Sequence, residues 1–196
     1  ANGEYKVEPT AVTTASFTRV NPRTPAPDPV GGDVQVASFN VLNYFVDLAP
    51  TSTSYPRGAN TAAELERQQT KLVSAITALD ADVVGLIEIA NDDGDALDTL
   101  VAALNAAQQD PADGYTAVAA PALSPANPIG GTYGTDAIRT AIIYRASVVT
   151  PAGPPPSDPA LLNPADPAFP TEPLFDRPPA VQAFGPVGGG EQFTVL

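Results

Sequence analysis

The stretch VQVASFNVLNYF (residues 34–45) begins as a β-strand and ends in a way that is unusual for one. Valine and phenylalanine are typical strand residues, whereas asparagine is depleted in strands, yet Asn40 and Asn43 interrupt the end of the run. A buried side-chain amide is unfavourable unless it is hydrogen-bonded. The two amides therefore either close a turn or point at a group that needs an oxygen ligand.

Composition and charge limit the classes of protein to consider. The chain has 196 residues, the length of one domain or of a piece of a larger one, and its apolar content of 43% is ordinary for a globular core. Asp and Glu number 22 against 9 Lys and Arg, giving a formal charge of −13. Such a surface repels polyanions unless a metal ion or a local basic cluster intervenes.

Several residue types are missing from the chain. Without cysteine there is neither a disulfide framework nor a soft-metal site, and without histidine the usual acid–base residue near neutral pH is absent. No run approaches the ~20 apolar residues of a transmembrane helix. The first residues, ANGEYKV, do not resemble a signal peptide.

The chain divides into zones by composition. Residues 1–32 form a polar lead-in that is either an edge strand or a strap, and residues 33–150 have the pattern of an α/β unit. Residues 151–186 hold roughly half of the 23 prolines, which predicts a long surface excursion without a helix or central strand through most of it. The final GGGEQFTVL predicts a turn followed by the start of a strand.

Two helices and three further strands are expected within the α/β unit. Thr61 and Glu64 form a T-x-x-E capping box at the start of the first helix. Residues 83–87 are continuously apolar, which is typical of a strand buried on both faces. Short strands are expected at 115–119 and 139–145, and this order of elements favours layers of sheet and helix. The apolar faces of the two helices are formed by Leu65, Leu72, Ile76 and Leu79, and by Leu97, Leu100, Val101 and Leu104.

Glu88 is the first candidate for chemistry. It follows the apolar strand in DVVGLIEIAND (82–92), where a carboxylate ordinarily caps a loop or pairs with an arginine. However, open α/β sheets bind ligands at the carboxyl ends of their strands, and Asn40 lies at the same place on the opening strand. One carboxylate and one amide oxygen, completed by water and substrate phosphate, suit a hard ion such as Mg²⁺.

Other polar segments are weaker candidates. NDDGD (91–95) lacks an acid at Ile89, where an EF-hand needs one, so we interpret it as a turn with acidic residues favoured by a helix dipole. GGTYGTDAIRTAIIYR (130–145) has no phosphate-loop pattern, and a turn cap or a surface ion pair is the default for its Asp136 and Arg139.

Arg177, in LFDRPPAVQAF (174–184), is either a solvated loop residue or a phosphate clamp, since a guanidinium binds phosphate by paired hydrogen bonds.

Four segments together resemble a known family. VASFNVLNYF, RQQTKLVSAITALDADVVGLIEI, GTDAIRTAIIYR and DRPPAVQAF followed by FTV occur in the order and spacing of the endonuclease/exonuclease/phosphatase superfamily, with the large extracellular bacterial nucleases as the branch most resembled. The resemblance runs from about residue 28 to the end. It implies the α/β fold of deoxyribonuclease I, a four-layered sandwich of two mixed sheets with outer helices, of which residues 33–196 would form an incomplete N-terminal portion.

The resemblance also implies roles for particular residues. Asn40 and Glu88 match the residues that help to hold the catalytic divalent metal, Mg²⁺ in the first instance with Mn²⁺ or Ca²⁺ as alternatives. Asn43 belongs to the N-V-L-N-Y-F signature, and we interpret it as orienting the site and substrate. Asp136 would lie at the rim of the active site, and Arg177 would contact a substrate phosphate.

The resemblance further implies that part of the catalytic apparatus is absent. In this family the strand beginning FTV leads into an Asn-His segment, followed by Gly-Asp-Phe-Asn and Asp-His segments, and none of these occurs before Leu196. We therefore expect the N-terminal half of a secreted or cell-surface bacterial nuclease. It would hydrolyse phosphodiesters of DNA or RNA with a metal, and would be inactive without its C-terminal half.

Three alternatives to a nuclease remain open at this point: a phosphomonoesterase, a lipid phosphodiesterase, and a surface binding module that keeps the fold without catalysis. Fold alone does not decide among them. The sequence downstream of Leu196 would separate the enzymes from the binding module.

Overall fold

A computed structural model describes residues 16, 18, 20, 24, 27–49, 57–127, 129–169 and 174–196. The lead-in at 1–32 falls largely outside these residues, so its predicted role as an edge strand or strap is not tested. The elements, in chain order, are β1 (Val36–Tyr44), α1 (Ala62–Leu79), β2 (Val83–Ala90), α2 (Asp95–Ala107), a 3₁₀ turn (Pro111–Asp113), β3 (Tyr115–Ala117), β4 (Ile138–Arg145), β5 (Val149–Pro151), α3 (Pro159–Leu162), β6 (Gln182–Pro186) and β7 (Phe193–Val195).

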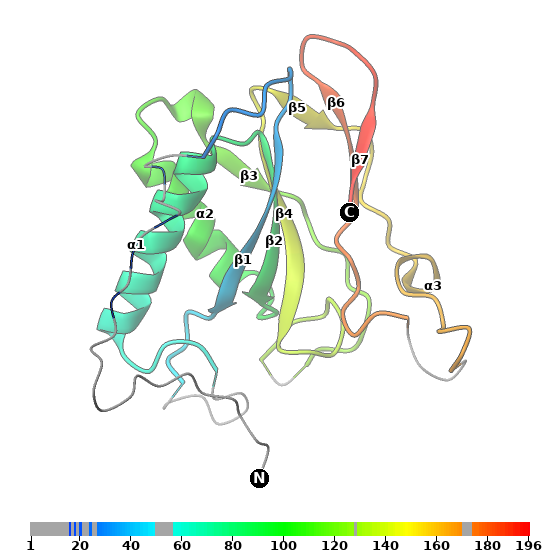
Figure 1. Ribbon diagram of the computed structural model, residues 1–196. Helices are drawn as coiled ribbons and strands as arrows, with labels where there is room; N and C mark the ends of the chain where they lie inside the picture. The colour runs from blue at the N-terminus through cyan, green and yellow to red at the C-terminus, as the bar shows by residue number, and fades with distance from the viewer. Residues whose placement is uncertain are drawn as a thin grey trace.

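The described elements form three layers (Figure 1). A four-stranded mixed sheet in the order β1-β2-β4-β3 lies in the middle, with α1 and α2 on one face. A three-stranded antiparallel sheet in the order β5-β6-β7 lies on the other side. Mixed α/β architecture with two sheets is confirmed as the fold class. Because β1 and β2 are parallel, α1 serves as the crossover between them.

The start of α1 follows the predicted capping pattern. The Thr61 hydroxyl accepts from the Glu64 backbone N–H at 3.2 Å. The Glu64 carboxylate reaches back to the backbone N–H of Asn60 at 2.8 Å, one residue earlier than an ideal capping box. The helix ends at Asp80, whose φ of 50° closes it in a left-handed C-cap.

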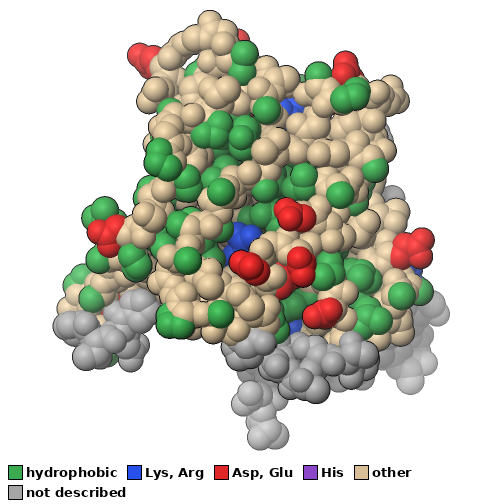
Figure 2. Space-filling model, turned by 180° about the vertical axis from the view of Figure 1, so that it is seen from behind, with side chains coloured by type: hydrophobic (Ala, Val, Ile, Leu, Met, Phe, Trp, Pro, Cys, Tyr) green, Lys and Arg blue, Asp and Glu red, His purple; other side chains and the backbone are tan. Residues whose placement is uncertain are grey.

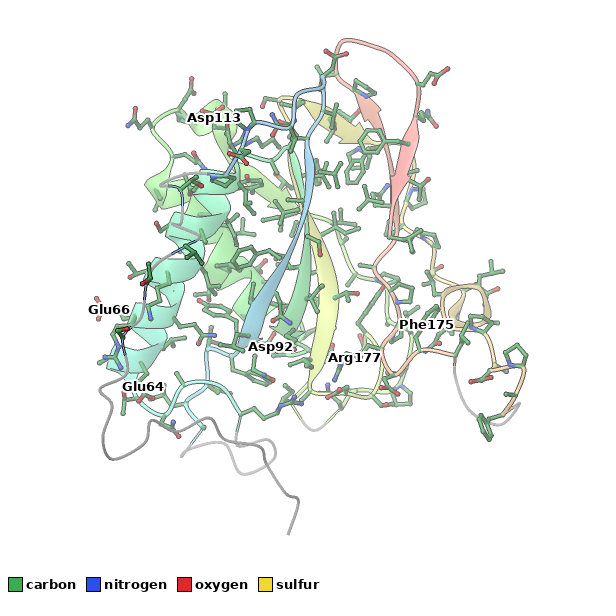
Figure 3. All side chains as sticks on the ribbon, viewed as in Figure 1. Glu64, Glu66, Asp92, Asp113, Phe175 and Arg177 are labelled. Atoms are coloured by element: carbon green, nitrogen blue, oxygen red, sulfur yellow. The ribbon has the colours of Figure 1, made fainter. Side chains whose placement is uncertain are left out.

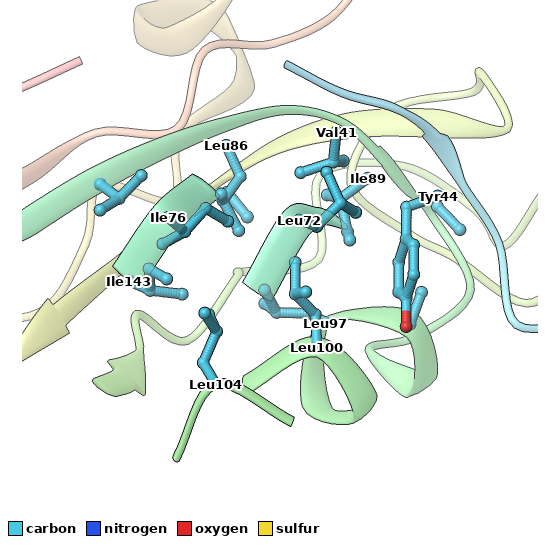
Figure 4. Packing of buried hydrophobic residues seen from close by; sticks show 14 of the residues in the cluster. Val41, Tyr44, Leu72, Ile76, Leu86, Ile89, Leu97, Leu100, Leu104 and Ile143 are labelled. Carbon is cyan, nitrogen blue, oxygen red and sulfur yellow. The ribbon is translucent and has the colours of Figure 1, made fainter. Parts of the chain in front are cut away.

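The main core lies between the helices and the four-stranded sheet (Figure 4). Leu72 and Ile76 of α1 and Leu97, Leu100 and Leu104 of α2 are buried, as their helical spacing predicts. They pack on strand residues of the same face, namely Val41, Tyr44, Leu86, Ile89 and Ile143. The predicted face residues Leu65, Leu79 and Val101 are only partly buried at its margin.

A smaller core joins the two sheets. Val83 and Ile142 face it from the four-stranded sheet, and Val149 and Phe184 from the three-stranded sheet. The Phe184 ring lies 5.2 Å from that of Tyr144 and 5.9 Å from that of Phe193, between centroids. The Tyr144–Phe184 contact joins the two sheets, whereas Phe184 and Phe193 are cross-strand neighbours within the three-stranded sheet.

Some predictions from the sequence are wrong in detail. Ile87 is 40% exposed, although the strand was expected to be buried on both faces through that residue. The proline-rich excursion does not extend to residue 186, because β6 is the middle strand of the second sheet, and the excursion also contains the short helix α3. Pro186 lies at the end of β6, where the lost N–H does least damage.

The described helices include none that is long and apolar enough to cross a bilayer.

Core packing predicts that replacing leucine by alanine destabilises the fold much more at a buried position than at an exposed one. Leu100→Ala removes a fully buried side chain between α2 and the sheet and should lower the free energy of unfolding by about 2–5 kcal/mol. Leu161→Ala makes the same change on α3, where the side chain is 77% exposed, and should cost under about 0.5 kcal/mol. Urea unfolding of both variants measures the difference, and equal costs would contradict the assignment of the core.

Candidate metal and phosphate site

Two irregularities lie side by side at the carboxyl ends of β1 and β2. The register of β1 against β2 shifts between Asn40 and Tyr44, and that of β2 against β4 shifts between Leu86 and Ile89. At each shift a residue other than glycine takes a left-handed conformation, with φ of 50° at Asn43 and 66° at Glu88. Strained backbone of this kind is unfavourable and clusters at functional sites.

The bulge in β2 decides where Glu88 points. Leu86 and Ile89 both belong to the core beneath the helices, although alternation along a regular strand would place residues 86 and 88 on one face. The extra residue therefore removes Glu88 from the helix-side core. The bulge in β1 has the same effect on Asn43, because Val41 and Tyr44 both remain in the core.

Asn43 binds Glu88 directly. Its side-chain amide donates to Glu88 Oε2 at 3.0 Å, and its backbone N–H donates to the same oxygen at 3.2 Å. No described residue donates to the other carboxylate oxygen of Glu88. The Asn43 Oδ1 is buried and has no hydrogen-bond partner among the described residues. This is the geometry that an orienting role for Asn43 requires.

Asn40 lies on the exposed face of β1, between Phe39 and Val41, which pack toward the helices. Its backbone pairs with Ile87, the neighbour of Glu88 on the adjacent strand. Its side-chain oxygen accepts from the Leu42 N–H at 2.7 Å and so closes a local turn at the β1 bulge. The turn alternative for the opening motif thus holds for Asn40, whereas Asn43 donates to the Glu88 carboxylate instead of closing a turn.

The donor set fits a hard divalent cation. Two side-chain oxygens receive no hydrogen bond from the described residues, the Asn43 Oδ1 and one carboxylate oxygen of Glu88. In the described part of the chain, no three Asp, Glu, His or Cys side chains converge on one point. The protein would therefore supply few ligands, and Mg²⁺ is the ion that commonly binds through one or two protein oxygens plus water and phosphate.

Asp136 joins two arginines near this end of the sheet. Its Oδ2 receives Nε and Nη2 of Arg177 at 2.8 and 2.7 Å, and its Oδ1 lies 3.3 Å from Nη1 of Arg57. All three side chains are partly exposed. Arg177 is therefore a partly exposed loop residue that is held by an ion pair with Asp136. Arg177 and Asp92 lie at the same end of the sheet as Glu64 (Figure 3).

Buried amides fix the loop that carries Asp136. The Asn91 side chain donates to the carbonyl oxygens of Tyr133, Gly134 and Asp136 at 3.0–3.2 Å. Asn127 donates to the carbonyl oxygens of Asn91 and Asp136 at 3.0 Å.

Gly131 completes this packing. A Cβ atom there would lie 1.8 Å from the Asn91 carbonyl oxygen, so only glycine permits the approach. Each of these contacts reduces the freedom of the Asp136 loop, and the carboxylate that holds the arginines is thereby fixed in place.

The backbone at Gly58 connects the two groups of residues. A Cβ atom at Gly58 would lie 2.9 Å from the Phe45 Cβ and 3.4 Å from the Asn43 carbonyl oxygen. Arg57 and Asn43 line the same groove, and Arg57 pairs with Asp136, so Arg57 links the Glu88–Asn43 pair to the Asp136–arginine cluster.

Arg139 corrects a prediction from the sequence. It is 5% exposed and makes no ion pair within 4 Å among the described residues, so it is not a surface ion-pair residue. Its guanidinium lies 5.9 Å from the Tyr133 ring centroid. Burial lowers its pKa, an effect opposed by the charge of Asp92 and other nearby carboxylates.

The turn before α2 behaves as expected from the sequence. Asp92 accepts from the N–H groups of Gly94 and Ala96 at 3.1–3.3 Å, at the start of α2. The face seen from behind shows acidic side chains gathered around a small basic patch (Figure 2).

A comparison with protein families assigns this sequence to a family. The sequence model of the endonuclease/exonuclease/phosphatase family matches residues 37–188. The chain belongs to this family. Members of the endonuclease/exonuclease/phosphatase family hydrolyse phosphodiesters or other phosphate esters and generally use divalent metals. A search of curated proteins found no match to the chain.

The sequence identified some of these residues and missed others. Arg57 was not selected, because it lies in a loop without a regular pattern. Asn91 was assigned to a turn and Asn127 was passed over. The only signal for them was the presence of asparagine next to a buried strand and in a glycine-rich loop, since their partners are distant in sequence.

Two buried tyrosines make a prediction about alkaline pH. Burial raises the pKa of Tyr44 and Tyr133 to about 12 from the ordinary value of 10.0. Above pH ~10 the unfolded chain loses these protons before the folded protein does, so stability should fall between pH ~10 and ~12. Phenolate absorbance should reveal late-titrating groups, and Tyr133→Phe should remove one of them. Titration of all tyrosines near pH ~10 in the folded protein would contradict this packing.

Proposed function

We propose that this chain provides the metal-binding and phosphate-binding part of an extracellular bacterial phosphodiesterase that acts on nucleic acid. The observation that carries the proposal is the Glu88 carboxylate, turned out of the core by a bulge and held by Asn43 beside the cluster of Asp136 with two arginines. The assignment to nucleic acid and to the outside of the cell rests on the resemblance to the extracellular nucleases.

In the proposed reaction, three residues at the strand ends bind or orient the metal. Glu88 and Asn40 hold a divalent cation, which when bound draws negative charge from a phosphoryl oxygen. Asn43 holds one carboxylate oxygen of Glu88 by two hydrogen bonds, and the other oxygen would be the one to bind the cation.

Asp136 holds Arg177 by two donors and Arg57 by one, and the other N–H groups of the two partly exposed guanidiniums would bind a substrate phosphate. The proposed hydrolysis also needs an acid–base residue, which accepts and delivers the proton of the attacking water. The sequence contains no histidine, so we propose that a segment outside these 196 residues supplies it.

Metal binding tests the role of Glu88. Glu88→Gln should weaken Mn²⁺ or Mg²⁺ binding at least about tenfold, measured by calorimetry, because it removes the carboxylate charge. The melting temperature without metal should change by less than about 2 °C, since the side chain is not part of the core.

Glu66→Gln is the matched control for this test, because Glu66 is an exposed carboxylate on α1 and should be neutral in both measurements. If Glu88→Gln binds the metal as tightly as the unchanged protein does, Glu88 is not a ligand.

Cleavage of plasmid DNA tests the proposed division of labour. With Mg²⁺ and Ca²⁺ present, the chain alone should cleave ~10²–10⁴-fold more slowly than the chain mixed with the segment that we propose supplies the histidine. Glu88→Gln should abolish cleavage by the mixture. Rapid cleavage by the unmixed chain, lost in Glu88→Gln, would show that the histidine requirement is wrong.

A further inference from the structure

A groove of about 760 Å³ begins at the candidate site and runs along α1. Asn43, which holds Glu88, lines one end of it. Arg57, Arg67 and Lys71 line its length, together with the helix-capping Glu64. The groove therefore extends from Asn43, the residue that holds Glu88, along the surface of the first helix.

The basic side chains of this groove are unusual in so acidic a protein. The chain has 9 Lys and Arg against 22 Asp and Glu. Outside the groove, the described basic residues have other positions: Arg145 is buried against Asp80, Arg139 is buried beside Tyr133, and Arg177 pairs with Asp136.

Arg67 and Lys71 differ from these residues. Both are exposed, and within the described part of the chain neither has an ion pair within 4 Å. Their charges are consequently uncompensated by contact and remain available to a ligand. In a negative surface, two neighbouring basic side chains attract a polyanion only at their own position. The position of Arg67 and Lys71 therefore indicates where a polyanion would bind.

The groove is fixed to the site by hydrogen bonds. Arg67 and Lys71 are four residues apart and so lie on one face of α1, about 6 Å apart along its axis. Gln68, between them, donates to the carbonyl oxygens of Val41 and Leu42 at 3.0 and 2.8 Å. These carbonyls belong to the β1 bulge that carries Asn43. Gln68 therefore links the basic face of α1 to the strand end at the proposed metal site.

We infer that this groove is the track of a phosphodiester strand that extends from the reaction centre along α1. The inference rests on the proposed function and refines it, because it assigns a polymeric substrate to the site. From Glu64 to Leu72 the helix rises about 12 Å, which matches three to four nucleotides at about 3.4 Å each. A single phosphate at the metal site would leave Arg67 and Lys71 unused, whereas a strand neutralises both.

Binding of a short oligonucleotide without metal tests the groove separately from the metal site. An oligothymidylate of about 12 nucleotides, labelled with a fluorophore, is titrated in chelator with the unchanged chain and with Arg67→Gln/Lys71→Gln. The double variant should bind about tenfold more weakly at low salt, and the slope of log K against log salt should fall by about 1.4, or 0.7 for each lost contact.

A charge-matched control separates local contact from net charge. Ala78→Glu/Ala102→Glu makes the same change in net charge at exposed helix positions that do not line the groove. It should alter the affinity by less than about twofold and keep the salt slope. Arg67→Lys/Lys71→Arg should restore most of the affinity, which also guards against misfolding of the glutamine variant.

The outcomes distinguish this inference from the proposed function. Equal weakening by the groove variant and the charge-matched control, or competition by thymidine monophosphate as effective as by the oligonucleotide, would overturn the groove as a strand track. Metal binding is measured separately, by the Mn²⁺ titration of Glu88→Gln, so either conclusion can fail while the other stands.

Discussion

The hydrogen bonds between Asn43 and Glu88 are the contact on which the site depends, because they join two bulges that lie on neighbouring parallel strands. If β2 were regular, Glu88 would point into the core beneath the helices, where an unpaired carboxylate is strongly unfavourable. If β1 were regular, the Asn43 side chain would not be placed to donate a hydrogen bond to the Glu88 carboxylate. Each irregularity is therefore useful only in the presence of the other, and α1 holds the first in place through Gln68.

Local features of the fold were accessible from the sequence. The cap at Thr61 and Glu64 and the leucine spacing of α2 depend on residues three or four positions apart, so periodicity is enough to find them. Ile87 was assigned to a doubly buried strand because an apolar run does not reveal how far the second sheet extends over it. The middle strand β6 was obscured by neighbouring prolines, although it contains only a terminal one.

The site was predictable to the extent that its residues follow strands. Asn40, Asn43 and Glu88 were found from their places at strand ends and from the family resemblance, while the bulges that orient them left no local signal. Arg57 reaches Asp136 across 79 positions of sequence, and Asn91 reaches the loop before β4 across more than 40. Contacts of that range depend on tertiary packing, which single-sequence patterns do not encode.

The left-handed backbone at Glu88 lowers the stability of the strand as long as the residue is a glutamate. Its φ of 66° is a conformation that glycine adopts freely and that costs other residues about 1–2 kcal/mol. Glycine at this position would relax the backbone and favour folding while removing the carboxylate. Variants selected only for thermal resistance would thus tend to lose the acid, and a family member with glycine here would have a more stable strand without the carboxylate.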